Sequence, residues 1–219
     1  MAEAADPSLE ALRLRLAPGI AAAAAFDGWS MPAVDAAAQA AGVDRELARF
    51  AFREGAMAMI AAWIDTVDSA MAAALPREKL AGLPIRERIR QLVWFRLTAI
   101  AGREEALRRA QAIMAMPQNV AATLSRGWSS ADKMWRLAGD VAVDLNHYTK
   151  RATLAALYTS VLAVWIDDAS AGKADTAAFL DRRIEDVMRF EKAKGRLLAG
   201  NDEHFSLVRL LGRLRYSGR

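Results

Sequence analysis

The chain has 219 residues, 54% of them hydrophobic, and a formal net charge of +4 at pH 7. That length suits one domain with a full core or a small head fused to a larger body, and so mild a charge does not by itself indicate nucleic acid binding. Cysteine is absent, and His147 and His204 belong to no HExxH or HxH motif. These facts exclude disulfides and Cys-ligated zinc and argue against a histidine metal site, so we expect neither a metal nor a cofactor.

The first residues indicate neither a secretory signal nor a transit peptide, because Glu3, Asp6 and Glu10 interrupt any basic and apolar run. The longest apolar-looking stretch, residues 152–166, contains several hydroxyl-bearing side chains. It is too short and too polar to span a bilayer. We therefore expect a cytoplasmic protein that touches the inner membrane only from its surface.

The elements are predicted to be helices throughout. Alanine is abundant, β-branched runs are scarce, and no Asn-Gly or Asp-Gly hairpin turn occurs. A first helix capped by Ser8 meets Pro18 and Gly19. The later helices are expected over residues 32–41, 44–50, 53–75, 84–101, 104–114, 117–125, 130–137, 145–168, 176–194 and 205–216.

Residues 33–60 read AVDAAAQAAGVDRELARFAFREGAMAMI and predict a helix-turn-helix. Gly42 can adopt the left-handed turn conformation, and Asp44 can cap the second helix. The segment resembles the head of TetR-family regulators, including the aromatic pair Phe50 and Phe52 near the end of the recognition helix.

Charge argues against DNA binding by this head. Residues 27–65 carry six acids against three bases, a net charge of −3, and Asp44 and Glu46 stand where the recognition helix would enter the major groove. We expect a retained head that no longer binds DNA. A TetR-type repressor that responds to a small lipid remains the alternative, because three bases are present: Arg45, Arg49 and Arg53.

Several short motifs along the chain occur in the same order as in one protein family. They are FDGW at 26–29, RRA at 108–110, Pro117 with Asn119, Asp132 with MW at 134–135, AGD at 138–140, Asp144 with Asn146, YT at 148–149, Arg151, and FLD at 179–181 with Arg183. This run over residues 26–190 resembles the ninth coenzyme-Q biosynthesis protein family (Coq-nine), and ordered pieces over such a length are far more specific than one motif.

Together with the helix pattern, the resemblance implies an all-α, TetR-like fold. We expect a vestigial helix-turn-helix head over residues 1–75, a helical lipid-binding domain over 76–195 and an amphipathic membrane-binding helix over 196–219. The resemblance also implies a homodimer that binds an isoprenoid lipid or quinone intermediate at the membrane. It would present this ligand to demethoxyubiquinone hydroxylase or to another hydroxylase of ubiquinone biosynthesis. No constellation of side chains supports catalysis, so we expect an accessory protein and not an enzyme.

The family's partner-facing surface patch matches four residues here: Met134, Asp144, Tyr148 and Arg151. Eukaryotic members commonly have Trp before this Tyr, whereas this chain has His147. We include His147 in the expected patch, and this difference leaves open which partner the patch binds. Asp140, Asp144 and His147 are spaced to share one helix face. A polar mouth or partner patch is consistent with this spacing, and so are helix caps together with a surface ion pair with Lys150 or Arg151.

Aromatic and methionine side chains in the ligand-domain helices favour a cavity for a long apolar ligand. The candidate lipid-binding residues are Trp94, Leu97, Met114, Met116, Trp135, Tyr158 and Trp165. For any one of these residues, ordinary core packing is the better explanation. Because burial of one isoprene unit contributes a few kcal/mol at most, tight binding requires several units and a long cavity.

The last residues, 205–219, read FSLVRLLGRLRYSGR and contain no acid. On a helical wheel one face is apolar and the other basic, which is typical of a helix lying in a bilayer interface. The expected membrane-binding residues are Leu207, Val208, Leu210, Leu211 and Leu214 on the apolar side, with Arg209, Arg213 and Arg215. A helix that covers the protein's own core or dimer face is the alternative.

Overall fold

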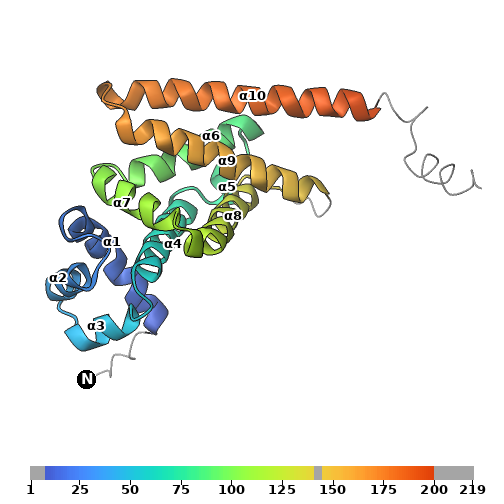
Figure 1. Ribbon diagram of the computed structural model, residues 1–219. Helices are drawn as coiled ribbons and strands as arrows, with labels where there is room; N and C mark the ends of the chain where they lie inside the picture. The colour runs from blue at the N-terminus through green and yellow to red at the C-terminus, as the bar shows by residue number, and fades with distance from the viewer. Residues whose placement is uncertain (1–7, 141–144, 200–219) are drawn as a thin grey trace, which may run out of the picture.

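The computed structural model describes residues 8–140 and 145–199, and it describes side chains for residues 8–140 and 147–189 (Figure 1). Within these ranges the chain forms helices and no strand, which confirms the all-α prediction. The helices are α1 Leu9–Asp27, α2 Met31–Ala41, α3 Arg45–Ala51, α4 Ala56–Ala74, α5 Arg77–Leu80, α6 Ile85–Ala99, α7 Glu104–Met114, η1 Pro117–Asn119, α8 Val120–Leu137, α9 Leu145–Asp167, η2 Ala171–Lys173 and α10 Ala174–Ala199. The predicted membrane-binding residues 207–215 and Asp144 lie outside the described residues, and the division into three domains stays a prediction.

The N-terminal head consists of α1, α2 and α3, which gather at one end of the molecule (Figure 1). Ser8 caps α1 as expected, because its Oγ accepts a hydrogen bond from the Ala11 amide at 3.2 Å. The helix does not end at Pro18 but continues through it to Asp27. At Gly19 an added Cβ would lie 3.1 Å from the Ala37 Cβ, so glycine lets α1 pack closely on α2.

The helix-turn-helix forms as predicted. Gly42 has φ 63° and ψ 36°, the left-handed conformation that ends α2. Asp44 caps α3, since its Oδ1 accepts from the Leu47 amide at 2.8 Å. Local sequence signals therefore specify this turn completely.

Helix α4 joins the head to the rest of the molecule, packing on α1 and also on α6, α7 and α8. Trp29 strengthens this junction: its ring lies 5.4 Å from that of Trp63 on α4, and its Nε1 donates to the Ala106 carbonyl of α7 at 2.9 Å. By length and composition alone, α4 is the one described helix that could cross a membrane. Residues 152–166, the longest apolar-looking stretch of the sequence, are too short and too polar for this role. The buried side chains of α4, which include Met59 and Met71, are those of a core helix in this fold.

Two predicted helices, 117–125 and 130–137, instead form η1 followed by the single helix α8. Glycine and serines at 127–130 indicated a break, yet the helix continues through them. Ser130 is buried there, and its Oγ donates to Asp68 Oδ2 of α4 at 2.9 Å. A tertiary hydrogen bond thus overrides the weak local helix propensity.

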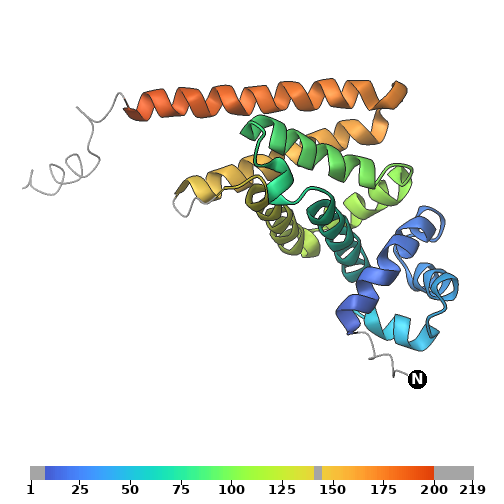
Figure 2. The ribbon, with the colours of Figure 1, turned by 180° about the vertical axis from the view of Figure 1, so that it is seen from behind.

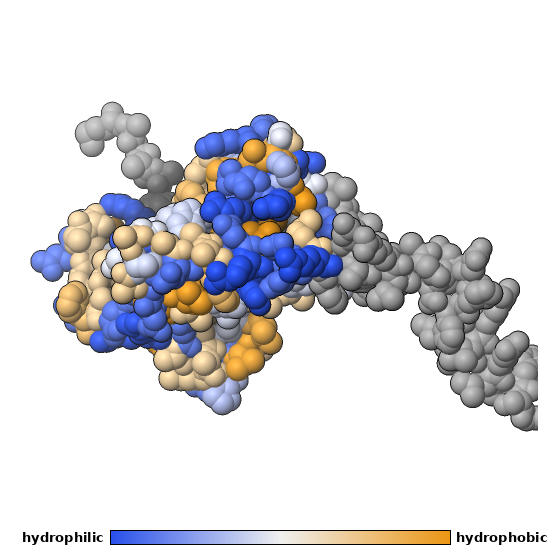
Figure 3. All heavy atoms as spheres, turned by 90° about the horizontal axis from the view of Figure 1, so that it is seen from above, coloured by the Kyte–Doolittle hydropathy of each residue, from blue (hydrophilic) through white to orange (hydrophobic). Residues whose placement is uncertain are grey.

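Helices α9 and α10 form the other end of the molecule. Helix α10 packs on α9 and α6 and extends past the body (Figures 1 and 2). Asp168 fixes the corner between them, because its Oδ2 accepts from the Thr176 amide at 2.8 Å and its Oδ1 from the Ser170 amide at 2.8 Å. Asp168 therefore holds the start of α10. Seen from above, hydrophilic residues run across the face of the molecule (Figure 3). Exposed charged residues of α10 include Asp181, Arg182 and Asp186.

Candidate functional site

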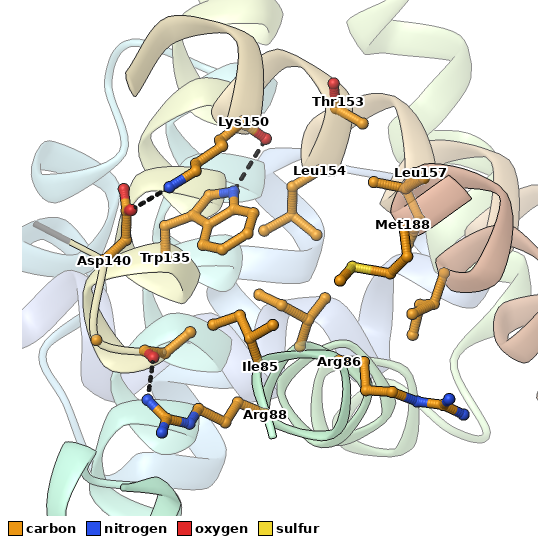
Figure 4. A pocket seen from close by; sticks show the side chains of 15 residues that line it. Ile85, Arg86, Arg88, Trp135, Asp140, Lys150, Thr153, Leu154, Leu157 and Met188 are labelled. Atoms are coloured by element: carbon orange, nitrogen blue, oxygen red, sulfur yellow. Dashed lines mark hydrogen bonds and ion pairs between the residues drawn. The ribbon is translucent and has the colours of Figure 1, made fainter. Parts of the chain in front are cut away.

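A cavity of about 400 Å³ lies between α6, the end of α8, α9 and α10 (Figure 4). Its volume falls within the range usual for small-molecule sites. Most of its lining is apolar, and these side chains come from three helices: Ile85, Ile89, Leu154, Leu157, Ile184 and Met188. We call this cavity the pocket.

One end of the pocket is polar. Lys150 Nζ contacts Asp140 Oδ1 at 2.6 Å and lies 5.4 Å from the centroid of the Trp135 ring. The Trp135 Nε1 donates to the Lys150 carbonyl at 2.9 Å, which holds the indole at this end (Figure 4). The residues at and just after the end of α8 and the first turns of α9 therefore supply these polar groups, while α6, α9 and α10 supply the apolar walls.

Arg88 closes the lower side of this polar end. Its guanidinium donates to three backbone carbonyls, those of Ala81, Leu83 and Ala138, each at 2.7 Å. The Ala138 carbonyl belongs to the C-terminal end of α8, where a cation is favoured by the helix dipole. Gly139 follows with φ 91°, and a Cβ there would lie 3.0 Å from Arg88 Nη1, so both the backbone conformation and the space require glycine.

Asp140 is the junction of an ion-pair chain. It contacts Lys150 on one oxygen and Arg151 Nη1 on the other at 3.1 Å, and Arg151 Nε contacts Asp132 Oδ1 at 2.6 Å. Burial raises the pKa of Asp140, but the hydrogen bonds from Lys150 and Arg151 outweigh it and hold that pKa below its ordinary value. The carboxylate is therefore ionised at neutral pH.

Of the seven residues predicted to bind lipid, the structure places Trp135 in the pocket lining. The other six lie outside that lining, and their contact with a lipid stays a prediction. Trp94 and Trp165 pack edge to face with centroids 5.8 Å apart, Leu97 is fully buried, and the Tyr158 ring lies under Arg96 at 4.8 Å. Met114 is half-buried, and Met116 is exposed.

Sequence reasoning missed most of the pocket, including Lys150 as a lining residue and the whole contribution of α10. The signal for α10 was present, because Ile184, Val187 and Met188 follow the spacing of one helical face. Nothing in that spacing showed which helix this face would meet.

A buried ion pair occupies the core beside the pocket. Asp68 of α4 and Arg96 of α6 form it with exposed fractions of 2% and 3%, and Asp68 also contacts Lys133 Nζ at 3.2 Å. Of the predicted aromatic residues, Tyr158 contacts this ion pair through the Arg96 guanidinium.

The residues of the predicted partner patch differ in their exposure. Met134 and Arg151 are buried, at 1% and 2% exposed, whereas Tyr148 is 61% exposed and His147 is half-buried. Trp128 of α8 joins the two aromatic residues, with its ring centroid 5.9 Å from that of Tyr148 and 6.4 Å from that of His147. Trp128, His147 and Tyr148 are called the aromatic cluster, and its role as a partner patch stays a prediction.

The helix-turn-helix head engages its arginines internally. Asp35 of α2 contacts Arg45 at 2.6 Å and Arg49 at 2.8 Å, and these hydrogen bonds hold the pKa of Asp35 well below its usual value. Arg53 lies over the Phe50 ring at 4.7 Å. The cations that kept the repressor alternative open are thus directed at groups of the head itself.

Among the side chains that the structure describes, no group of three or more His, Cys, Asp or Glu residues could hold a metal ion.

The chain matches the COQ9 family over residues 120–191, which include α8, α9 and most of α10. It is 32% identical over 168 residues to "Ubiquinone biosynthesis protein COQ9, mitochondrial" of Homo sapiens, covering 74% of this chain and 52% of that protein. The Rattus norvegicus protein of the same name is 33% identical over 168 residues, covering 74% of this chain and 54% of that protein. The chain spans about half the length of these curated relatives.

A solved structure shares the fold. It is the crystal structure of the TetR transcriptional regulator from Nitrosomonas europaea, with a TM-score of 0.63 and 21% sequence identity, and the match covers 80% of this chain and 96% of that one. This likeness confirms the TetR-like fold class. The family resemblance is likewise confirmed, and the chain is a relative of the COQ9 proteins with a TetR-like, all-α fold.

Proposed function

We propose that this chain is an accessory protein of ubiquinone biosynthesis. It binds an isoprenoid quinone intermediate in the pocket and presents it to a hydroxylase without turning it over itself. The observation that carries the proposal is the pocket: an apolar cavity with one polar end, built mainly from residues in the segment that matches COQ9. The names of the curated relatives supply the pathway.

The pocket suits a molecule with a polar ring and an apolar chain. Side chains such as Ile89, Leu154 and Ile184 offer apolar walls, and burial of apolar surface stabilises a complex by about 25 cal/mol per Å². Lys150 and Asp140 offer a cation and an acceptor at one end. A ligand lying along the pocket would pair its ring with this end and its isoprenoid chain with the walls.

The aromatic cluster is the proposed docking site for the hydroxylase, which the family resemblance suggests is demethoxyubiquinone hydroxylase or a related enzyme. Tyr148 and His147 lie on α9 within one turn of Lys150, so the cluster adjoins the polar end of the pocket. Substitution Tyr148→Ala should weaken capture of the purified hydroxylase without emptying the pocket. Unchanged capture would remove the cluster from the proposal.

Membrane contact and self-association complete the proposal. The basic, apolar segment 205–216 would bind the surface of the inner membrane, each arginine contributing about 1 kcal/mol near anionic lipid. A chain truncated after Asn201 should fold but no longer float with liposomes, and unchanged flotation would contradict this assignment. Light scattering after size exclusion should report a homodimer, and a monomer at micromolar concentration would contradict that part.

Solvent extraction followed by mass spectrometry tests the ligand directly. Protein purified from its native host should release a quinone or a quinone precursor. Leu154→Trp, which fills the pocket, should release much less, whereas Ala156→Trp places the same side chain on the exposed face of α9 and should release as much as the parent chain. Circular dichroism would establish that both variants fold.

An empty pocket, or hydrophilic ligands alone, would overturn the proposal. The repressor alternative would then merit a test on promoter DNA. It is less well supported now, because Asp35 neutralises Arg45 and Arg49 on the would-be recognition helix.

A further inference from the structure

The ionisable residues that line the pocket are unequal in sign. Arg86, Arg88 and Lys150 are bases, and Asp140 is the one acid among the lining residues. The bases do not contribute equally, because the Arg86 guanidinium points away from the polar end in Figure 4, whereas Arg88 and Lys150 flank it. Two cations therefore face one carboxylate at this end.

The carboxylate is also engaged from its other side. Asp140 Oδ2 contacts Arg151 Nη1 at 3.1 Å, so Asp140 keeps a charged partner if Lys150 turns toward a ligand. This matters because a buried carboxylate that loses its last partner is left uncompensated, whereas one that keeps a second cation loses less. Lys150 is thus the cation that the site can release.

Lys150 and Arg88 differ in how firmly they are held. The Arg88 guanidinium is fixed by three backbone carbonyls and, among the described contacts, pairs with no carboxylate, so its positive charge stays in place. Lys150 carries three donors on a flexible stem, and its described hydrogen bond uses one of them, to Asp140. A fixed cation with a movable one beside it suits an anionic group better than a neutral or cationic one.

We propose that the pocket selects amphiphiles with an anionic head group and that Lys150 binds this head directly. The class includes carboxylates, such as a prenylated aromatic acid or a fatty acid, and phosphate monoesters or diesters of lipids. The apolar chain of the ligand lies along α6, α9 and α10, and the head lies between Lys150 and Arg88. This inference rests on the proposed lipid-binding function and narrows its ligand, because it favours a prenylated ring compound with an ionised acid group over a neutral quinone.

Binding of matched single-chain probes to the delipidated full chain tests the proposal. Dodecanoate, dodecanol and dodecylamine share one chain and differ in head charge, and isothermal titration calorimetry at neutral pH and low salt, below their micelle concentrations, compares them. A charge-assisted hydrogen bond predicts about 10-fold tighter binding of dodecanoate than of dodecanol. Dodecylamine should bind most weakly, because Arg88 and Lys150 repel it.

Variants locate the effect. Lys150→Gln should weaken dodecanoate binding more than dodecanol binding, so that the preference falls to less than about 3-fold, whereas general structural damage would weaken the binding of both probes alike. Lys150→Arg should preserve the preference. Lys79→Gln removes the same charge from exposed α5, outside the pocket, and should behave as the parent chain.

Each result decides something. Equal binding of the three probes, or a preference that survives Lys150→Gln, would overturn the anionic head while leaving the lipid-binding function intact. Absence of binding by all three would overturn the function of the pocket as well. Dodecyl phosphate distinguishes the sources: tighter binding than dodecanoate assigns the site to a lipid phosphate, weaker binding assigns it to a carboxylate, and both support the anionic head.

Discussion

The ion pair between Asp68 and Arg96 is buried at the centre of the larger helical body, and its removal should have a large and specific effect. Asp68 contacts Arg96 and Lys133 and accepts from Ser130 Oγ at 2.9 Å. Asp68→Ala leaves the Arg96 guanidinium, which is 3% exposed, without its carboxylate. Breaking a buried pair in this way costs about 3–5 kcal/mol of unfolding free energy.

A double-mutant cycle measured by urea unfolding separates the pair from simple loss of packing. Asp68→Leu combined with Arg96→Met replaces both charges by apolar groups and should cost several kcal/mol less than the sum of the two single substitutions. Asp65→Ala is the control, because this neighbouring carboxylate is a third exposed and should cost about 1 kcal/mol or less.

The same variants test where the ligand lies. Neither Asp68 nor Arg96 lines the pocket, so the folded double variant should retain as much extracted lipid as the parent chain. An Asp68→Ala variant within about 1 kcal/mol of the parent would refute the energetic reasoning. Loss of lipid from a folded double variant would instead place the ligand in the core around the pair.

Two further outcomes follow from the charges of the head and of the α8–α10 corners. Asp35→Asn should free Arg45 and Arg49 to contact DNA phosphates. The slope of log affinity for duplex DNA against log salt concentration, measured by fluorescence anisotropy, should then steepen by up to about 2. An unchanged slope would show that these arginines cannot reach phosphates. Because folding lowers the pKa values of Asp140 and Asp168, the stability they contribute is complete above the ordinary aspartate pKa of 3.8 and declines as pH falls through their lower folded values. Asp168→Asn should therefore flatten the loss of unfolding free energy between about pH 4 and pH 2, and an equal slope in both chains would contradict that origin.

The features that the sequence predicted correctly depend on neighbouring residues. Ser8 and Asp44 cap helices through amides three residues away, and the Gly42 amide bonds to carbonyls of the helix that it ends. Such signals are complete within a few residues of chain, which is why the helix-turn-helix and most helix positions could be read from the sequence. The break expected within α8 failed because Ser130 bonds Asp68, 62 residues away.

The pocket could not be predicted in the same way, because its composition depends on how distant helices meet. Trp94 and Trp165 satisfy the same pattern as Trp135, yet they pack on each other in the core while Trp135 faces the cavity. An aromatic residue on an apolar helix face predicts burial and does not distinguish a core from a cavity wall. The sequence suggested Lys150 as the partner in a surface ion pair and not as a pocket residue, since its place in the pocket depends on Asp140, which lies ten residues earlier, beyond the end of α8.

Asp140 explains how binding in the pocket could be communicated to a partner. Its two cations are neighbours on α9: Lys150 serves the pocket, and Arg151 also donates to the His147 carbonyl at 3.0 Å, at the base of the aromatic cluster. An anionic head that draws Lys150 away would strengthen the ion pair between Asp140 and Arg151, because the carboxylate would then interact with one cation and not with two. The polar end of the pocket, and not its apolar end, thus adjoins the cluster. A lipid bound as proposed would have its head toward the docking enzyme and its chain within the protein, which is the orientation that presentation of a ring for hydroxylation requires.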